Sequence, residues 1–331
     1  MHKNIQKQFV ATCSSILIFA ACGHAGELGP PVACEIGTEC FVQQGPDLDS
    51  GPGVLDATCG VATYDGHKGW DIRLRTMPDI RSGIDVVAPA SGQVLRVRDE
   101  MADRLVQNNE REALKGRECG NGVVLSHANG LTTQLCHLKA GSIRVAPGDE
   151  VQRGQVVGQI GASGLATFPH VHMSVRRDNR PVEPLTGAAL ADGAMACGDL
   201  DDSLMMPEAR EVLAAPLTAI IGTGVTDGVP KSSDIVREGL PADITKTSEA
   251  VVGWIWAINL NAGWQMRLRV VGPGGQLISE HTTDPLPKAK AEYLAYAGRR
   301  IGAETGRYTL TAEVLDGSRS IAKTTTVIDV N

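Results

Sequence analysis

Two short segments carry histidine and carboxylate side chains at spacings that suit a metal ion. His67 and Asp71 are four residues apart, and Gly69 between them permits a turn that brings both to one ion. His170 and His172 are two residues apart in a strand-like segment, so both imidazoles face the same side. Zinc prefers nitrogen, sulfur and carboxylate ligands. The two segments predict one metal site if the fold brings them together.

A further histidine, His137, directly follows Cys136. Neighbouring strand residues point to opposite faces, so this thiol and imidazole are not expected to form a catalytic pair. Cys119 and Cys136 also flank a predicted hairpin with its turn at Asn129-Gly130, which favours a disulfide between them. Both features argue against a cysteine peptidase.

The remaining cysteines are typical of an exported protein. Six cysteines follow Cys22, an even number that predicts three disulfides. None has the C-x-x-C spacing of a zinc knuckle. Apart from the hairpin pair, three pairings remain open for a set of four: Cys34, Cys40, Cys59 and Cys197.

Residues 1–22 read as an export signal. Lys3 and Lys7 precede an apolar stretch that is too short to span a bilayer as a mature helix. Cleavage could follow Ala25, or residues 19–22 could serve as a lipobox that lipidates Cys22 and attaches the protein to an outer membrane. The net charge of −7 and the lack of a basic patch predict no nucleic-acid partner, and the oligomeric state is left open.

Short strand-like blocks separated by glycine and proline predict a mostly β protein with two domains. We expect a small β-barrel-like catalytic domain at 23–184, a linker at 185–215, and an Ig-like β-sandwich at 216–331. The charged residues 99–118 suit either a substrate-contacting insertion or a solvated excursion. Trp254 and Trp256 share a strand face, which favours a place in the sandwich core over an exposed glycan-docking surface.

Several motifs, in this order, resemble the M23 family of zinc metallopeptidases, the lysostaphin-like or LytM-like peptidoglycan endopeptidases. The resemblance extends to about residue 184. It rests on GHKGWD (66–71), VVAPASGQV (86–94), GNGVVLSH (120–127), CHL (136–138), GDEVQRGQVVGQIG (148–161) and FPHVH (168–172).

The resemblance implies a small β catalytic domain that holds one Zn²⁺ per chain. It assigns the metal to His67, Asp71 and His172, and the catalytic pair to His137 and His170. Three protein ligands leave a coordination position for water. Leu135 is a departure, because the family usually has a tyrosine there that can support the oxyanion.

The function implied is hydrolysis of peptide bonds in the stem or cross-bridge peptides of peptidoglycan. The enzyme would work in the periplasm of a Gram-negative bacterium, or as a membrane-anchored lipoprotein. Two other functions suit the same residues: a non-catalytic, LytM-like activator of a cell-wall amidase, and a metallopeptidase that cleaves a protein. The full set of metal and catalytic histidines favours an enzyme over the activator.

Overall fold

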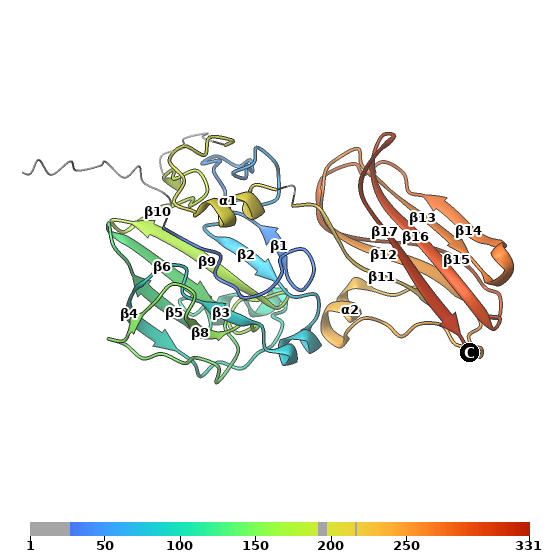
Figure 1. The fold of residues 1–331 in the computed structure, drawn as a ribbon, viewed down its shortest axis with the longest axis horizontal. Helices are drawn as coiled ribbons and strands as arrows, with labels where there is room; N and C mark the ends of the chain where they lie inside the picture. Colours follow the sequence, from blue (N-terminus) through green and yellow to red (C-terminus); the bar gives the residue numbers. More distant parts are fainter. Residues whose placement is uncertain (1–26, 191–196, 216) are drawn as a thin grey trace, which may run out of the picture.

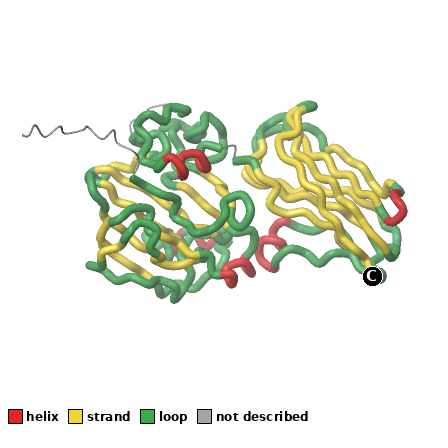
Figure 2. The backbone as a smooth tube through the Cα atoms, in the orientation of Figure 1, coloured by secondary structure: helices red, strands yellow, loops and turns green. Residues whose placement is uncertain are grey.

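Two β-rich domains lie side by side in the structure, a computed structural model (Figure 1). It describes residues 27–190, 197–215 and 217–331, so the predicted export segment and Cys22 lie outside the described residues. Strands dominate and the helices are short, as the backbone trace makes plain (Figure 2). The predicted mostly β fold is confirmed. Within the described ranges, no helix has the length and apolar character needed to cross a membrane.

The first domain is built on an open antiparallel sheet with the order β1-β2-β9-β6-β5-β4-β7. Strand β10 pairs with β9, and β3 pairs with β8 in a small separate sheet. The strands are β1 (Phe41–Gln44), β2 (Trp70–Arg73), β3 (Asp85–Val87), β4 (Gly92–Arg98), β5 (Gly122–Ser126), β6 (Leu131–Cys136), β7 (Glu150–Val151), β8 (Val156–Gln159), β9 (His170–Arg177) and β10 (Arg180–Val182). The 3₁₀ helices are η1 (Met77–Ser82), η2 (Asn108–Glu110) and η3 (Glu112–Leu114), the last two within the charged segment 99–118.

Alternation along β9 separates a core face from a polar face. Val171, Met173 and Val175 are fully buried in the first hydrophobic core. His170 and His172 therefore lie on the opposite face of the sheet. Strand β2 alternates in the same way, because Ile72 lies in this core between Asp71 and Arg73.

The second domain is a sandwich of two antiparallel sheets, β11-β12-β15 and β14-β13-β16-β17, with a hydrophobic core of its own. Its classification as Ig-like stays a prediction. The elements are β11 (Ala219–Thr226), α2 (Ser232–Glu238), β12 (Val251–Leu260), β13 (Gln265–Val271), η5 (Pro273–Gly275), β14 (Leu277–Thr282), β15 (Lys290–Arg299), β16 (Gly306–Asp316) and β17 (Arg319–Val330).

Trp254 and Trp256 are buried, but not in the sandwich core. They point to the outer face of β12 and join a separate apolar cluster that includes Phe41 of the first domain. Gly222 and Gly224 lie opposite them on β11, and a Cβ atom at either glycine would come within 3.1 Å of the Trp254 ring. The tryptophans thus serve the contact between the domains, which corrects the predicted core placement.

Part of the predicted 185–215 linker packs on the first domain. Helix α1 (Pro207–Leu213) buries Ala209 and Leu213 in the first core, together with Leu204 and Met205. The Cys59–Cys197 disulfide ties this segment to the loop before β2. The other two disulfides join Cys34 to Cys40 and Cys119 to Cys136, the last as the hairpin spacing predicts.

Candidate active site

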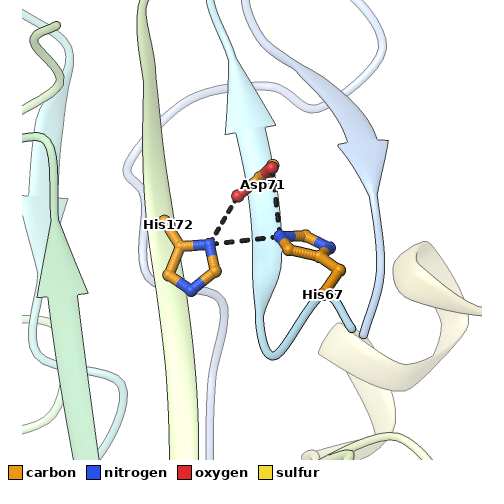
Figure 3. Close-up of side chains that lie close together, drawn as sticks. All are labelled: His67, Asp71 and His172. Carbon is orange, nitrogen blue, oxygen red and sulfur yellow. Dashed lines mark hydrogen bonds and ion pairs between the residues drawn. The ribbon is translucent and has the colours of Figure 1, made fainter. Parts of the chain in front are cut away.

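Side chains from β2, β9 and the turn before β2 converge on the polar face of the first sheet (Figure 3). Asp71 pairs directly with His172 across the two strands. His172 Nδ1 lies 2.7 Å from Asp71 Oδ1, and His67 Nε2 lies 3.2 Å from Asp71 Oδ2 and 3.3 Å from His172 Nδ1. One ligand atom from each residue lies within 4.8 Å of the others.

This donor set fits a divalent metal such as zinc. Two imidazole nitrogens and one carboxylate oxygen match the ligand classes of a three-residue zinc site with an open position. Gly69 contributes space, because a Cβ there would lie 2.5 Å from His172 Nε2. The sequence suggested a turn at this glycine, whereas the structure shows that close approach of the His172 ring requires it.

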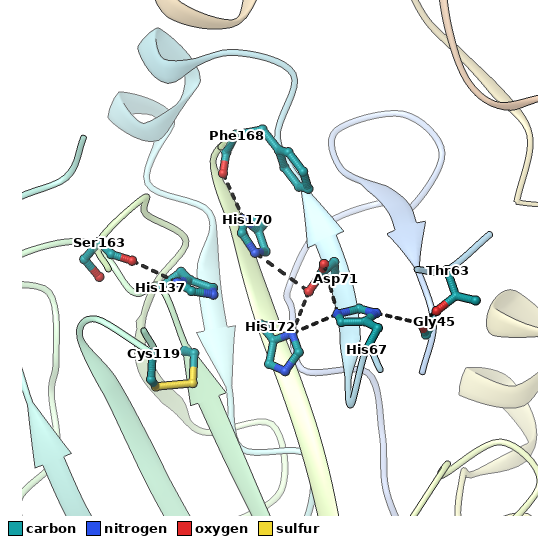
Figure 4. A network of polar contacts seen from close by, with 11 residues as sticks. Gly45, Thr63, His67, Asp71, Cys119, His137, Ser163, Phe168, His170 and His172 are labelled. Atoms are coloured by element: carbon teal, nitrogen blue, oxygen red, sulfur yellow. Dashed lines mark hydrogen bonds and ion pairs between the residues drawn. A yellow bond between two sulfur atoms is a disulfide. The ribbon is translucent and has the colours of Figure 1, made fainter. Parts of the chain in front are cut away.

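The orientation of His67 is set by the loop after β1. Its Nδ1–H donates to the Gly45 carbonyl at 2.7 Å, and the Thr63 hydroxyl donates to the same oxygen at 2.8 Å (Figure 4). Because a carbonyl can only accept, Nδ1 carries the proton and the Nε2 lone pair faces Asp71 and His172. Such outer contacts hold metal-binding histidines in one tautomer.

His137 and His170 lie beside this cluster, with ring centroids 4.4 Å apart. His137 Nδ1–H donates to the Ser163 carbonyl and His170 Nδ1–H donates to the Phe168 carbonyl, each at 2.8 Å (Figure 4). Both rings thereby keep Nε2 free, and His170 Nε2 lies 3.7 Å from Asp71 Oδ1. His137 has a φ of 61°, an uncommon conformation for a residue other than glycine.

Burial and nearby charges shift the pKa values of these groups in opposite directions. Burial lowers the pKa of His170, and it lowers the pKa of His137 further below the usual range, where neighbouring imidazoles add to the effect. Burial also opposes the charged form of His67, but Asp71 outweighs it and raises the pKa of that imidazole. The pKa of Asp71 is lowered despite its burial, because three imidazoles surround the carboxylate. Burial thus favours the neutral forms of His137 and His170.

Leu135 does not face the site. It is fully buried in the first core and pairs with Met173, while its neighbour Cys136 pairs with His172. Sequence reasoning missed a different aromatic residue, Tyr64, whose ring stacks on His67 with centroids 4.3 Å apart. Its position three residues before His67 was the available signal. The residue as a whole is half-exposed.

Arg73 links the site to the second domain. Its guanidinium lies 4.6 Å from the Phe168 ring centroid and 5.1 Å from that of Trp256. Arg73 Nη1 donates to Gln43 at 2.7 Å and pairs with Glu292 of β15 at 3.1 Å. Phe168 also packs on His170. Arg73 therefore connects Trp256 and Glu292 of the second domain to a residue that contacts a catalytic candidate.

Residues 65–184 match peptidase family M23. These residues form a peptidase family M23 domain. The match begins two residues before His67 and ends where the sequence resemblance ends, so the predicted family is confirmed for this part of the chain.

Curated relatives align with only part of this chain. The DD-carboxypeptidase/endopeptidase Mpg of Neisseria meningitidis serogroup B is 37% identical over 111 residues, which cover 33% of this chain and 23% of the relative. The peptidoglycan DD-endopeptidase ShyA of Vibrio cholerae is 39% identical over 66 residues, or 20% of this chain and 15% of the relative. The chain thus spans less than a quarter of the length of either relative.

Among solved structures, a mutant catalytic domain of the prophage-encoded M23 protein EnpA from Enterococcus faecalis is 26% identical to this chain. The alignment covers 44% of this chain and 86% of that chain, with a TM-score of 0.29.

Proposed function

We propose that this protein is a zinc-dependent endopeptidase that hydrolyses peptide bonds in peptidoglycan stem or cross-bridge peptides. The observation that carries the proposal is the convergence of a three-residue ligand set with two neutral imidazoles on one sheet face. The substrate class is taken from the M23 domain and from relatives named as DD-endopeptidases. Residues 1–22 and Cys22 remain the basis for proposing export to the periplasm or attachment as a lipoprotein.

His67, Asp71 and His172 would hold the metal. A zinc ion bound there would supply a Lewis acid that lowers the pKa of water and polarises the scissile carbonyl. Since Asp71 raises the pKa of His67, protons compete for its Nε2 as the pH falls, and we expect metal affinity to weaken on acidification.

His137 and His170 would move the protons of the reaction. Each presents an unprotonated Nε2, so one can accept the proton of the attacking water, and the other, once protonated, can stabilise the oxyanion or deliver a proton to the leaving amine. Tyr64, stacked on His67, would be the hydroxyl that donates to developing charge, a role that the buried Leu135 cannot fill.

Purified full-length protein, prepared without chelator, tests the proposal by metal analysis and by incubation with isolated sacculi. We expect about one zinc per chain and new amine termini in the released muropeptides. A protein that binds no zinc and releases nothing, yet stimulates a cell-wall amidase, would be a regulator instead. If sacculi stay intact while a glycine-rich protein is cleaved, the substrate would be a protein instead of peptidoglycan.

A further inference from the structure

A cleft of about 360 Å³ lies where the two domains meet. The first domain contributes Gln44 and Phe168 to its lining, and the second contributes Ser233, Arg237 and Glu292. The cleft adjoins the candidate active site through its lining residues. The Phe168 ring packs on His170, and Gln44 pairs with Asp71 across β1 and β2.

Gln44 has a side-chain amide with unused hydrogen-bonding capacity. The residue is 8% exposed, it lines the cleft, and its side chain forms no hydrogen bond within the described part of the chain. Its amide atoms are not among the fully buried unpaired ones, so they are open to water or to a ligand in the cleft. A glutamine amide both donates and accepts, and can therefore pair with a peptide group.

The unbalanced charge of the cleft is positive. Arg73 also lines the cleft, but Glu292 neutralises its charge. The N–H groups of Arg73 donate to the Gln43 side chain and to the carbonyls of Leu74 and Arg75. Arg237, exposed in the last turn of α2, forms no ion pair within the described ranges. Its guanidinium is thus available for a carboxylate, which arginine binds through two parallel hydrogen bonds.

We propose that this cleft binds a carboxylate-bearing segment of the peptide substrate, with Arg237 paired to the carboxylate and Gln44 hydrogen-bonded to a peptide group. The proposal rests on the proposed function, because the segment bound there adjoins the peptide bond presented to His137 and His170. The second domain would then contribute to substrate specificity.

Two synthetic stem peptides that differ only in a free or an amidated side carboxylate test the proposal. With the full-length zinc-loaded protein, we expect KM to be about tenfold lower for the free acid. Arg237→Ala should remove this preference by raising KM for the free acid alone, and Arg237→Lys should restore part of it. Gln44→Leu should raise KM for both peptides, with zinc content unchanged. Arg300→Ala, an exposed arginine just beyond β15, is the matched control and should keep the wild-type preference.

Equal KM values for the two peptides with the wild-type protein, or an unchanged preference in Arg237→Ala, would overturn the proposal. Failure of the wild-type protein to cut either peptide or sacculi would count against the proposed function instead. Calorimetric titration of the same two peptides into the wild-type protein and Arg237→Ala then tests peptide binding in the cleft independently of catalysis. Tighter binding of the free acid by the wild type alone supports it, and any other pattern overturns it.

Discussion

Two sheet faces lie near the domain boundary, and they differ in the side chains that they present. The face of β2 and β9 carries Asp71 and His172, a polar cluster whose donor atoms crowd one small space. The outer face of β12 carries Trp254 and Trp256, an apolar surface that packs on α2 of its own domain and on Phe41 of the first domain. The first face offers ligands for a cation, and the second packs partly on the neighbouring domain. Arg73 lies between them, in contact with both Phe168 and Trp256.

We expect the largest effect on the polar face from removal of a metal ligand. His172→Ala deletes one of three metal ligands, so we expect loss of bound zinc and of all detectable hydrolysis of sacculi. Metal analysis of the purified variant and muropeptide release measure the two effects. His281→Ala, an exposed histidine on β14, is the control and should behave like the wild type. Retention of stoichiometric zinc by His172→Ala would contradict the ligand assignment.

Removing a catalytic imidazole should separate chemistry from metal binding. His137→Ala or His170→Ala is expected to lower kcat by about 10²–10⁴-fold, the usual contribution of a general acid or base, while zinc remains bound. Because His137 has a positive φ, His137→Asn provides a second variant whose side chain tolerates that conformation. Loss of zinc from His170→Ala alone would show that the roles of His170 and His172 are divided differently.

The apolar face is tested by truncating a tryptophan. Trp256→Ala leaves a cavity in the interdomain cluster and should lower the free energy of unfolding by about 3–5 kcal/mol. Thermal and denaturant unfolding measure this loss. Tyr296→Ala on the adjacent strand β15 is the control, because Tyr296 is half-exposed and its change should stay within about 0.5 kcal/mol. A loss of unfolding free energy in Trp256→Ala as small as that in Tyr296→Ala would mean that this cluster contributes little stability.

The smallest expected effect concerns the link between the two faces. Glu292→Gln leaves the buried Arg73 guanidinium without its carboxylate, at a cost of about 1–3 kcal/mol. We also expect kcat to fall several-fold with zinc content unchanged, since Phe168 packs between Arg73 and His170. Glu280→Gln removes an exposed partner of Arg269 and serves as the control. A stability loss without any change in kcat would limit Arg73 to a structural role.

Local spacing was sufficient to predict much of the candidate site. Strand alternation places His170 and His172 on one face regardless of the rest of the fold, and the hairpin turn brings Cys119 near Cys136. The mostly β class followed from short apolar blocks between glycine and proline. The family motifs then united segments that lie about a hundred residues apart.

Other features depend on contacts that no local pattern encodes. The Cys59–Cys197 pairing and the packing of residues 204–213 on the first core follow from long-range packing. The Cys34–Cys40 pairing and the stacking of Tyr64 on His67 join residues close in sequence, but spacing alone does not select them. The outer placement of Trp254 and Trp256 is similar, since a buried strand face looks the same in sequence whether a sheet or another domain covers it.

The sequence by itself determined which side chains of each strand share a face, because that depends only on the two-residue period of a β-strand. Tertiary structure alone decided what each face meets. The register between β2 and β9 places Asp71 beside His172, and the packing of the two domains brings Phe41 to the Trp256 cluster and forms the cleft at Arg237. Such pairings are set by the fit of surfaces that are remote in the chain.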